Sequence, residues 1–146
     1  MEHEQISFVG AWKLISFEFR RDEGETMYPF GEKAQGSIIY TESGRYSAQL
    51  MRVDRPRFAV PDQMRGTSQE IEASYRGCIS YFGSYEVDHE NGFIIHRVEA
   101  SLFPNMEGGN QIRLFELAGD RLQLRTPPFK LDGEQAIGIL QWKRIG

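Results

Sequence analysis

The sequence comprises 146 residues, of which 40% are hydrophobic and 26% charged, and its formal net charge at pH 7 is −4. This length holds one hydrophobic core but not two, so we expect a single domain over residues 1–146. The mixed charges form no basic face for nucleic acid or anionic lipid, and neither a signal peptide nor an apolar run of ~20 residues is present, so we expect a cytoplasmic protein with neither of those partners.

The N-terminal region predicts one long strand followed by a loop. Residues 8–20 are rich in β-branched and aromatic types, and alternation places Trp12, Leu14, Ser16 and Glu18 on one face of the strand. Residues 21–35 contain the Asp, Gly and Pro residues that indicate a loop.

A second hairpin and a helix are predicted next. Residues 36–41 and 45–51 flank the turn residues Glu42-Ser43-Gly44, but the two faces of this hairpin have similar polarity and leave its register open. The prolines in residues 52–66 indicate a long connection rather than a strand. Thr67, with an acidic residue following at Glu70, predicts the start of a helix of about three turns.

Residues 81–102 predict a β-hairpin on two grounds. Asn91-Gly92 is typical of a two-residue type I′ turn, because both central residues need positive φ. Such a turn pairs Glu90 with Phe93 and leaves an inward face that is almost wholly apolar. The inward pairs are then Val87 with His96, Tyr85 with Val98, Gly83 with Ala100, and Tyr81 with Leu102. On the outer face, Glu86 pairs with Arg97 in a cross-strand ion pair and Ser84 with Glu99, while Ser101 also points outward.

The C-terminal region predicts a third hairpin and a last strand. With Gly119-Asp120 as the turn, Leu117 pairs with Leu122, Phe115 with Leu124, and Arg113 with Thr126. The last strand covers residues 136–144.

Together these elements predict an all-β fold, an up-and-down antiparallel β-barrel of about eight strands with one short helix in the third-to-fourth strand connection. The second, fourth and sixth connections are tight turns, whereas the first, third, fifth and seventh are long. Because alternate connections of a meander lie at the same end, one end should be closed and the other ringed by long loops. The open end has the shape expected of a pocket mouth.

Several motifs resemble those of known barrels. Gly10-Ala11-Trp12 resembles the G-x-W motif of lipocalin and calycin barrels, and Arg144 resembles the basic residue that packs across that tryptophan. The chain is also similar to the bacterial and fungal lipocalin-like domain family over nearly its whole length. The similar runs begin at Tyr46 (YSAQLMRVDRPRF), His96 (HRVEASLFPN), Arg113 (RLFEL), Leu124 (LRTPP) and Leu140 (LQWKR). The resemblance implies the barrel, but fold alone does not imply a function.

The inward-facing polar residues are the candidates for ligand binding. A buried arginine is costly unless it is paired, so Arg113 needs an anion, which is either Glu18 at a similar height or an acidic group of a ligand. Tyr81 lies beside Arg113 in this layout, and Gln49 faces inward in one of the two possible registers. The predicted ligand-binding residues are Glu18, Gln49, Tyr81, Tyr85, His96, Phe103 and Arg113.

The remaining chemistry-bearing residues leave alternatives open. His96 near Tyr85 is either a general base or a core histidine whose hydrogen bonds are satisfied. Phe103 and the other aromatic residues of the long loops either cover a ligand or pack with one another. The lone Cys78 is either a small core hydrophobe or a reactive thiol. No catalytic or phosphate-binding motif occurs, and His3, His89 and His96 are too dispersed to converge, so we expect no metal and no cofactor.

Three functions are compatible with these residues. The first is a binding protein that encloses a small, mostly apolar molecule with one acidic or carbonyl group, oriented by Arg113 and tyrosine hydroxyls. The second is a cofactor-independent isomerase or cyclase of a polyketide- or terpenoid-like substrate in the same pocket. The third is a barrel filled by its own side chains that acts through its outer surface. Neither the ligand nor the oligomeric state, monomer or homodimer, follows from the sequence.

Overall fold

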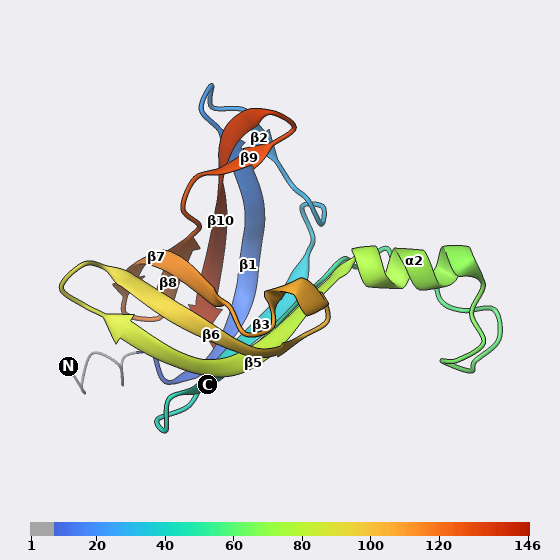
Figure 1. The fold of residues 1–146 in the computed structure, drawn as a ribbon, viewed down its shortest axis with the longest axis horizontal. Coiled ribbons are helices and arrows are strands. Elements are labelled where there is room, and N and C mark those ends of the chain that lie inside the picture. Colours follow the sequence, from blue (N-terminus) through green and yellow to red (C-terminus); the bar gives the residue numbers. More distant parts are fainter. Residues whose placement is uncertain (1–7) are drawn as a thin grey trace.

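The computed structural model describes residues 8–146, which form a closed barrel of eight antiparallel strands (Figure 1). The predicted fold class is therefore confirmed. The barrel strands are β1 (Gly10–Arg21), β3 (Gln35–Tyr40), β4 (Arg45–Met51), β5 (Cys78–Asp88), β6 (Phe93–Ser101), β7 (Asn110–Ala118), β8 (Arg121–Arg125) and β10 (Glu134–Arg144). Each pairs with its neighbour in that order, and β1 closes the ring by pairing with β10. No described helix is long and apolar enough to cross a membrane.

The connections differ between the two ends of the barrel as expected. One end carries the short turns after β3, β5 and β7. The other end carries the long connections, which contain the short strands β2 (Thr26–Met27) and β9 (Phe129–Leu131), the helix α2 (Ser68–Arg76) and the single turn η1 (Pro104–Met106). β2 pairs with β1 and β9 with β10, so both extend the long-loop end of these two strands (Figure 1).

The β5–β6 hairpin has a longer turn than predicted. Asp88 pairs with Phe93, and residues 89–92 form a four-residue loop in place of a two-residue type I′ turn. The Asp88 carboxylate accepts hydrogen bonds from the backbone and side-chain N–H groups of Asn91, at 3.0 and 2.9 Å, and only Gly92 takes a positive φ. The register therefore differs by two residues near the turn, with Tyr85 opposite His96. Because side chains alternate with a period of two, the same residues still face inward there.

A β-bulge in β6 changes the pairing nearer the open end. Gly83 pairs with Val98 but Phe82 pairs with Ala100, so Glu99 is an extra residue on β6. A Cβ on Gly83 would lie 1.9 Å from the carbonyl oxygen of Arg97, which explains the glycine. The predicted orientations of Ala100 and Ser101 are therefore wrong. Ser101, predicted to point outward, lies opposite the inward-facing Tyr81, and Ala100, predicted to point inward, lies opposite Phe82.

The outer-face ion pair of this hairpin is confirmed in spite of the different register. Arg97 donates to Glu86 at 2.7 Å, although the two residues are diagonal neighbours rather than directly opposed. Glu99 faces outward and accepts a hydrogen bond from Arg45 at 3.0 Å, so its predicted pairing with Ser84 is wrong.

A second bulge, in β1, overturns the predicted position of Glu18. The β1–β10 register shifts between Leu14 and Ser16, and one extra residue reverses which side chains face inward. Trp12 and Leu14 face the interior before the bulge, and Phe17 faces it afterwards. Glu18 therefore lies on the outer face, where Arg20 donates a hydrogen bond to it at 3.2 Å.

The other hairpins agree with the sequence where it specified them. Across the β7–β8 turn, Leu117 pairs with Leu122 and Phe115 with Leu124, as predicted. The sequence did not determine the register of the β3–β4 hairpin. In the structure, Ile38 lies opposite Ala48. This register directs Ala48 inward and leaves Gln49 on the outer side, where it donates to Ser47 at 2.9 Å.

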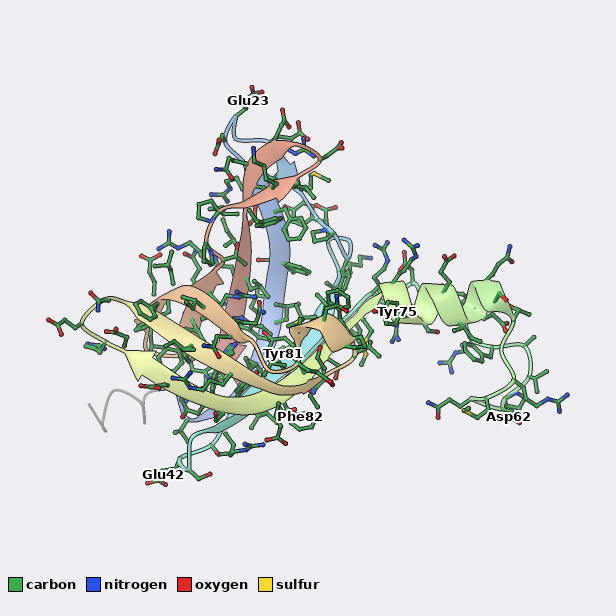
Figure 2. All side chains as sticks on the ribbon, in the orientation of Figure 1. Glu23, Glu42, Asp62, Tyr75, Tyr81 and Phe82 are labelled. Carbon is green, nitrogen blue, oxygen red and sulfur yellow. The ribbon has the colours of Figure 1, made fainter. Side chains whose placement is uncertain are left out.

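Helix α2 and the segment before it extend away from the barrel (Figure 1). Thr67 and Glu70 form the capping box at its start, and Glu70 also accepts a hydrogen bond from the backbone N–H of Ala59 at 3.0 Å. No residue of α2 is buried. Figure 2 shows Tyr75 at the end of the helix nearest the barrel and Asp62 at the far end of this projection.

Trp12 plugs the closed end of the barrel. Its side chain is 0% exposed, and its indole N–H donates to the carbonyl oxygen of Phe8 at 2.9 Å. The guanidinium carbon of Arg144 lies 4.3 Å from the centre of the Trp12 ring. The resemblance of these two residues to the tryptophan and basic residue of lipocalin barrels is thereby confirmed, and the contact stabilises the junction of β1 and β10.

Replacement of Trp12 by alanine tests this role. We expect Trp12→Ala to lower the free energy of unfolding by about 3–5 kcal/mol, the usual cost of truncating a buried aromatic side chain. Urea denaturation measures the change, and Lys13→Ala at the exposed neighbouring position is the control. A Trp12→Ala protein as stable as the parent would show that the closed end does not depend on this side chain.

Candidate functional site: a cavity inside the barrel

The barrel encloses a cavity of about 540 Å³ that opens at the long-loop end. Its volume is in the range typical of small-molecule sites. The expectation in the third hypothesis that the barrel is filled by its own side chains is therefore wrong. Most of the wall is apolar, and the aliphatic and phenylalanine side chains include Phe17, Phe19, Ile38, Leu50, Ile79, Leu124 and Leu140.

Each of the four long connections contributes an aromatic residue to the cavity. These are Phe30 before β3, Tyr75 in α2, Phe103 before η1 and Phe129 in β9. Phe30 packs edge-on against Phe17 with ring centroids 5.4 Å apart, so it forms part of the barrel core. Phe103 is 51% exposed. The mouth is thus lined by aromatic rings but remains open.

Arg113 supplies a positive charge to the wall of this apolar cavity. Its guanidinium donates to the carbonyl oxygen of Ile112 at 2.9 Å and to the side-chain oxygen of Gln111 at 3.2 Å. Both acceptors are neutral. Among residues 8–146, no carboxylate pairs with Arg113, because Glu18 lies on the other side of the wall. The guanidinium therefore has the capacity to bind an anionic or carbonyl oxygen of a ligand.

Tyr81 lies within the barrel beside Arg113, and Figure 2 shows it at the centre of the strands. Burial raises the pKa of Tyr81, while the charge of Arg113 and a hydrogen bond to it act in the opposite direction. Tyr81 is therefore a neutral hydroxyl near neutral pH. It provides a second polar group at the same part of the wall as Arg113.

His96 lies deeper in the barrel, in a cluster of tyrosines. It is 1% exposed, stacks on Tyr46 with ring centroids 4.4 Å apart, and its Nε2 lies 2.8 Å from the hydroxyl of Tyr40. Burial first, and the charge of Arg113 second, lower the pKa of His96 to about 3. Burial also raises the pKa of Tyr40 well above its usual value. Both groups are therefore neutral at physiological pH.

The Tyr40 hydroxyl and Nε2 of His96 share one hydrogen bond, whose donor depends on the tautomer of the imidazole. The other ring nitrogen, Nδ1, is buried and has no partner among the described residues. Of the two predicted roles for His96, the core position is therefore observed, but one of its nitrogens is not satisfied.

The predicted site residues divide into two groups. Tyr81, His96, Phe103 and Arg113 line the cavity. Glu18, Gln49 and Tyr85 do not: the first two lie on the outer side, and the Tyr85 hydroxyl donates to the carbonyl oxygen of Thr41 at the closed end, at 2.8 Å. The bulge in β1 turns Glu18 away from the cavity. The register of the β3–β4 hairpin turns Gln49 away from it.

Sequence reasoning missed several cavity residues. Gln111 precedes Arg113 by two positions and therefore shares its face, a relation that the period of two could have revealed. Ser101 reaches the cavity through the β6 bulge, for which the sequence gives no clear signal. Trp142 lines the cavity and its buried indole N–H has no hydrogen-bond partner among the described residues.

The cavity offers little else that could perform chemistry. Cys78 lies at its edge, and burial raises the pKa of the thiol, which lowers its reactivity as a nucleophile. No group of three or more His, Cys, Asp or Glu side chains within residues 8–146 could hold a metal ion. Binding of a ligand near Arg113 is the chemistry that this arrangement supports best.

Comparisons with known proteins agree with this geometry. A family model described as a lipocalin-like domain matches residues 9–145. The chain is also similar to the 4′-hydroxy-3′-methoxypropiophenone carrier protein ppsC of Aspergillus oryzae (strain ATCC 42149 / RIB 40). The two are 30% identical over 106 residues, which cover 68% of this chain and 96% of that protein. No solved structure matches the chain.

The buried histidine predicts a pH dependence of stability. Below pH 6.5 the unfolded chain takes up a proton at His96 that the native chain, with a pKa of about 3, does not bind. Stability should therefore fall by up to about 1.4 kcal/mol per pH unit as the pH drops from 6.5 towards 3. Urea denaturation between pH 7 and 5 should show this slope in the parent and a weaker one in His96→Phe. Equal slopes would mean that His96 is protonated in the native state.

Proposed function

The chain belongs to the lipocalin-like domain family, and from this we propose that it binds and carries a small, mostly apolar molecule in its barrel. The ligand bears an acidic or carbonyl oxygen that accepts hydrogen bonds from Arg113. The observation that carries the proposal is a cavity of about 540 Å³ with apolar walls and a guanidinium without a carboxylate partner among the described residues. Such a site is suited to one oriented small molecule.

The similar carrier protein narrows the class of ligand. The compound in that protein's name is an aromatic ketone that also carries a phenol and a methoxy group. We propose that this chain takes aromatic ketones or phenols of the same general kind. The rings of Phe17, Phe19 and Tyr75 provide apolar contact for an aromatic ligand, and the polar oxygen lies near Arg113 and Tyr81.

Within this proposal the cavity-lining residues have different roles. Arg113 and Tyr81 orient the ligand, Gln111 holds the guanidinium in place, and Phe103 covers the ligand at the mouth. His96 contributes to the floor of the cavity as a neutral ring stacked on Tyr46. Glu18, Gln49 and Tyr85 have no ligand contact in this arrangement.

A second candidate function is isomerisation or cyclisation of such a molecule without a cofactor. The observation that favours it is the presence of Arg113 and Tyr81 on the same part of the cavity wall, where they could stabilise a developing negative charge. The two candidates are separated by incubating the protein with an aromatic ketone and analysing the extract by chromatography and NMR. A new isomer formed only with active protein supports catalysis, and unchanged ligand supports a carrier.

Filling the cavity tests the binding site itself. Ala48 lines the cavity from β4, so Ala48→Phe places a ring inside it and should weaken binding at least tenfold. The probe is 4′-hydroxy-3′-methoxypropiophenone, and binding is followed by quenching of tryptophan fluorescence, since Trp142 lies on the cavity wall.

The matched control is Ser47→Phe, which adds the same ring at the adjacent position of β4, opposite the exposed Phe82. It should bind the probe as the parent does. Circular dichroism confirms that both variants are folded. Equal affinities of the parent and a folded Ala48→Phe protein would place the ligand outside the barrel, and no binding of aromatic ketones by the parent would reject the proposed class of ligand.

A further inference from the structure

The guanidinium of Arg113 differs from the other arginine on the cavity wall. Arg76, at the mouth, forms an ion pair with Glu72 of the same helix, at 3.3 Å. Arg113 instead donates to the neutral oxygens of Ile112 and Gln111, forms a hydrogen bond with the neutral Tyr81 hydroxyl, and has no carboxylate partner among residues 8–146. A half-buried positive charge in an apolar cavity is stabilised most strongly by a negative charge on the ligand.

The groups that face Arg113 carry no negative charge that could substitute for the ligand. They are Tyr40 on β3, Tyr46 on β4, Tyr81 on β5, His96 on β6 and Gln111 on β7 itself. Burial raises the pKa of all three tyrosines, so these phenols keep their protons. The protein's own phenols therefore do not neutralise the guanidinium, although all three interact with it electrostatically.

Resting on the proposed function, we propose that the barrel binds its ligand as a phenolate, with the ionised oxygen against Arg113, and selects acidic phenols over neutral aromatic ketones. On binding, the O–H bond of the ligand breaks and its proton passes to the solvent. The Tyr81 hydroxyl donates a second hydrogen bond to the phenolate oxygen. The class of ligand is a phenol with a carbonyl group para to the hydroxyl.

The chemistry of such phenols explains why the ligand ionises while the tyrosines do not. A para carbonyl spreads the phenolate charge over the ring and the ketone oxygen, so the phenol is more acidic than tyrosine. The delocalised anion also loses less hydration free energy than a carboxylate when it enters an apolar cavity. The arrangement thus favours a phenolate over a carboxylate at this position.

The proton cannot be kept by the protein near neutral pH. The pKa of His96 is about 3, so His96 does not accept a proton in that range. The pKa of Cys78 at the cavity edge is raised by burial, and the tyrosines remain protonated. We therefore expect the pH dependence of binding between pH 5 and 8 to follow the ionisation of the ligand, so that acid releases it.

Ultraviolet absorption tests the inference directly, because the phenolate of a para-acyl phenol absorbs at longer wavelength than the neutral phenol. The probes are 4′-hydroxypropiophenone and its methyl ether, 4′-methoxypropiophenone, which cannot ionise. At a pH below the pKa of the free phenol, the bound phenol should show the phenolate band. Its Kd should rise about tenfold per pH unit as the pH is lowered, because only the ionised fraction binds. The ether should bind at least tenfold more weakly than the phenol, without pH dependence.

Three variants assign the effect to the guanidinium. Arg113→Met should lose the phenolate band and bind the phenol no better than the ether, whereas Arg113→Lys should retain the band with reduced affinity. Arg97→Met is the matched control, because it removes the same charge from the outer face, where Arg97 pairs with Glu86 at 2.7 Å. Arg97→Met should behave as the parent does.

The outcomes separate this inference from the proposed function. If phenol and ether bind equally well, with the spectrum of the neutral phenol, the cavity is a carrier site but the phenolate inference is wrong. A phenolate band that persists in a folded Arg113→Met protein would also overturn it. If benzoate binds more tightly than the phenol, the site selects a carboxylate instead. Failure of both probes to bind would reject aromatic ketones as ligands, and with them this inference.

Discussion

The pairing of β1 with β10 is the constraint on which the other features depend. It closes the sheet from Trp12–Arg144 at one end to Arg21–Ala136 at the other, and so creates an interior. Trp12 and Arg144 occupy the first pair of this seam and seal the closed end. Since the tight turns lie at that end as well, the long connections and their aromatic residues collect at the other. The position of the cavity mouth therefore follows from chain closure and loop length.

The positive charge of Arg113 distinguishes one part of this mostly apolar cavity wall from the rest. Apolar walls favour any small hydrophobic molecule roughly in proportion to buried area, and they discriminate poorly among such molecules. Arg113 adds a hydrogen-bond donor with a positive charge at one part of the wall, with Tyr81 beside it and Gln111 as one of its acceptors. The specificity of the site is therefore proposed to lie in a few polar groups, while the aromatic rings supply most of the contact area.

The sequence predicted the barrel well but the faces of its strands only in part. Alternation and loop lengths were sufficient for the strand order, the open end and the inward positions of Tyr81, His96 and Arg113. The errors have two causes: bulges in β1 and β6, and a turn in which the Asp88 side chain stabilises a longer loop than Asn91-Gly92 suggests. A bulge adds one residue and reverses the alternation beyond it, which moved Glu18 out of the site and Ser101 into it. Gly83 is a local trace of the β6 bulge, but the pattern of alternating residues in β1 gives no sign of the bulge between Leu14 and Ser16.

The pKa values of the groups that line the cavity are relevant to whether the protein carries its ligand or catalyses a reaction on it. Acid–base catalysis near neutral pH requires a group whose pKa lies near the working pH. His96, with a pKa of about 3, and the buried tyrosines, with raised pKa values, lie on opposite sides of that range. Catalysis in this barrel would therefore have to depend on stabilisation of a negative charge by Arg113 without proton transfer to the protein. With the anionic ligand that we propose, the site would exchange no proton with its ligand, which favours the proposed carrier function over isomerisation.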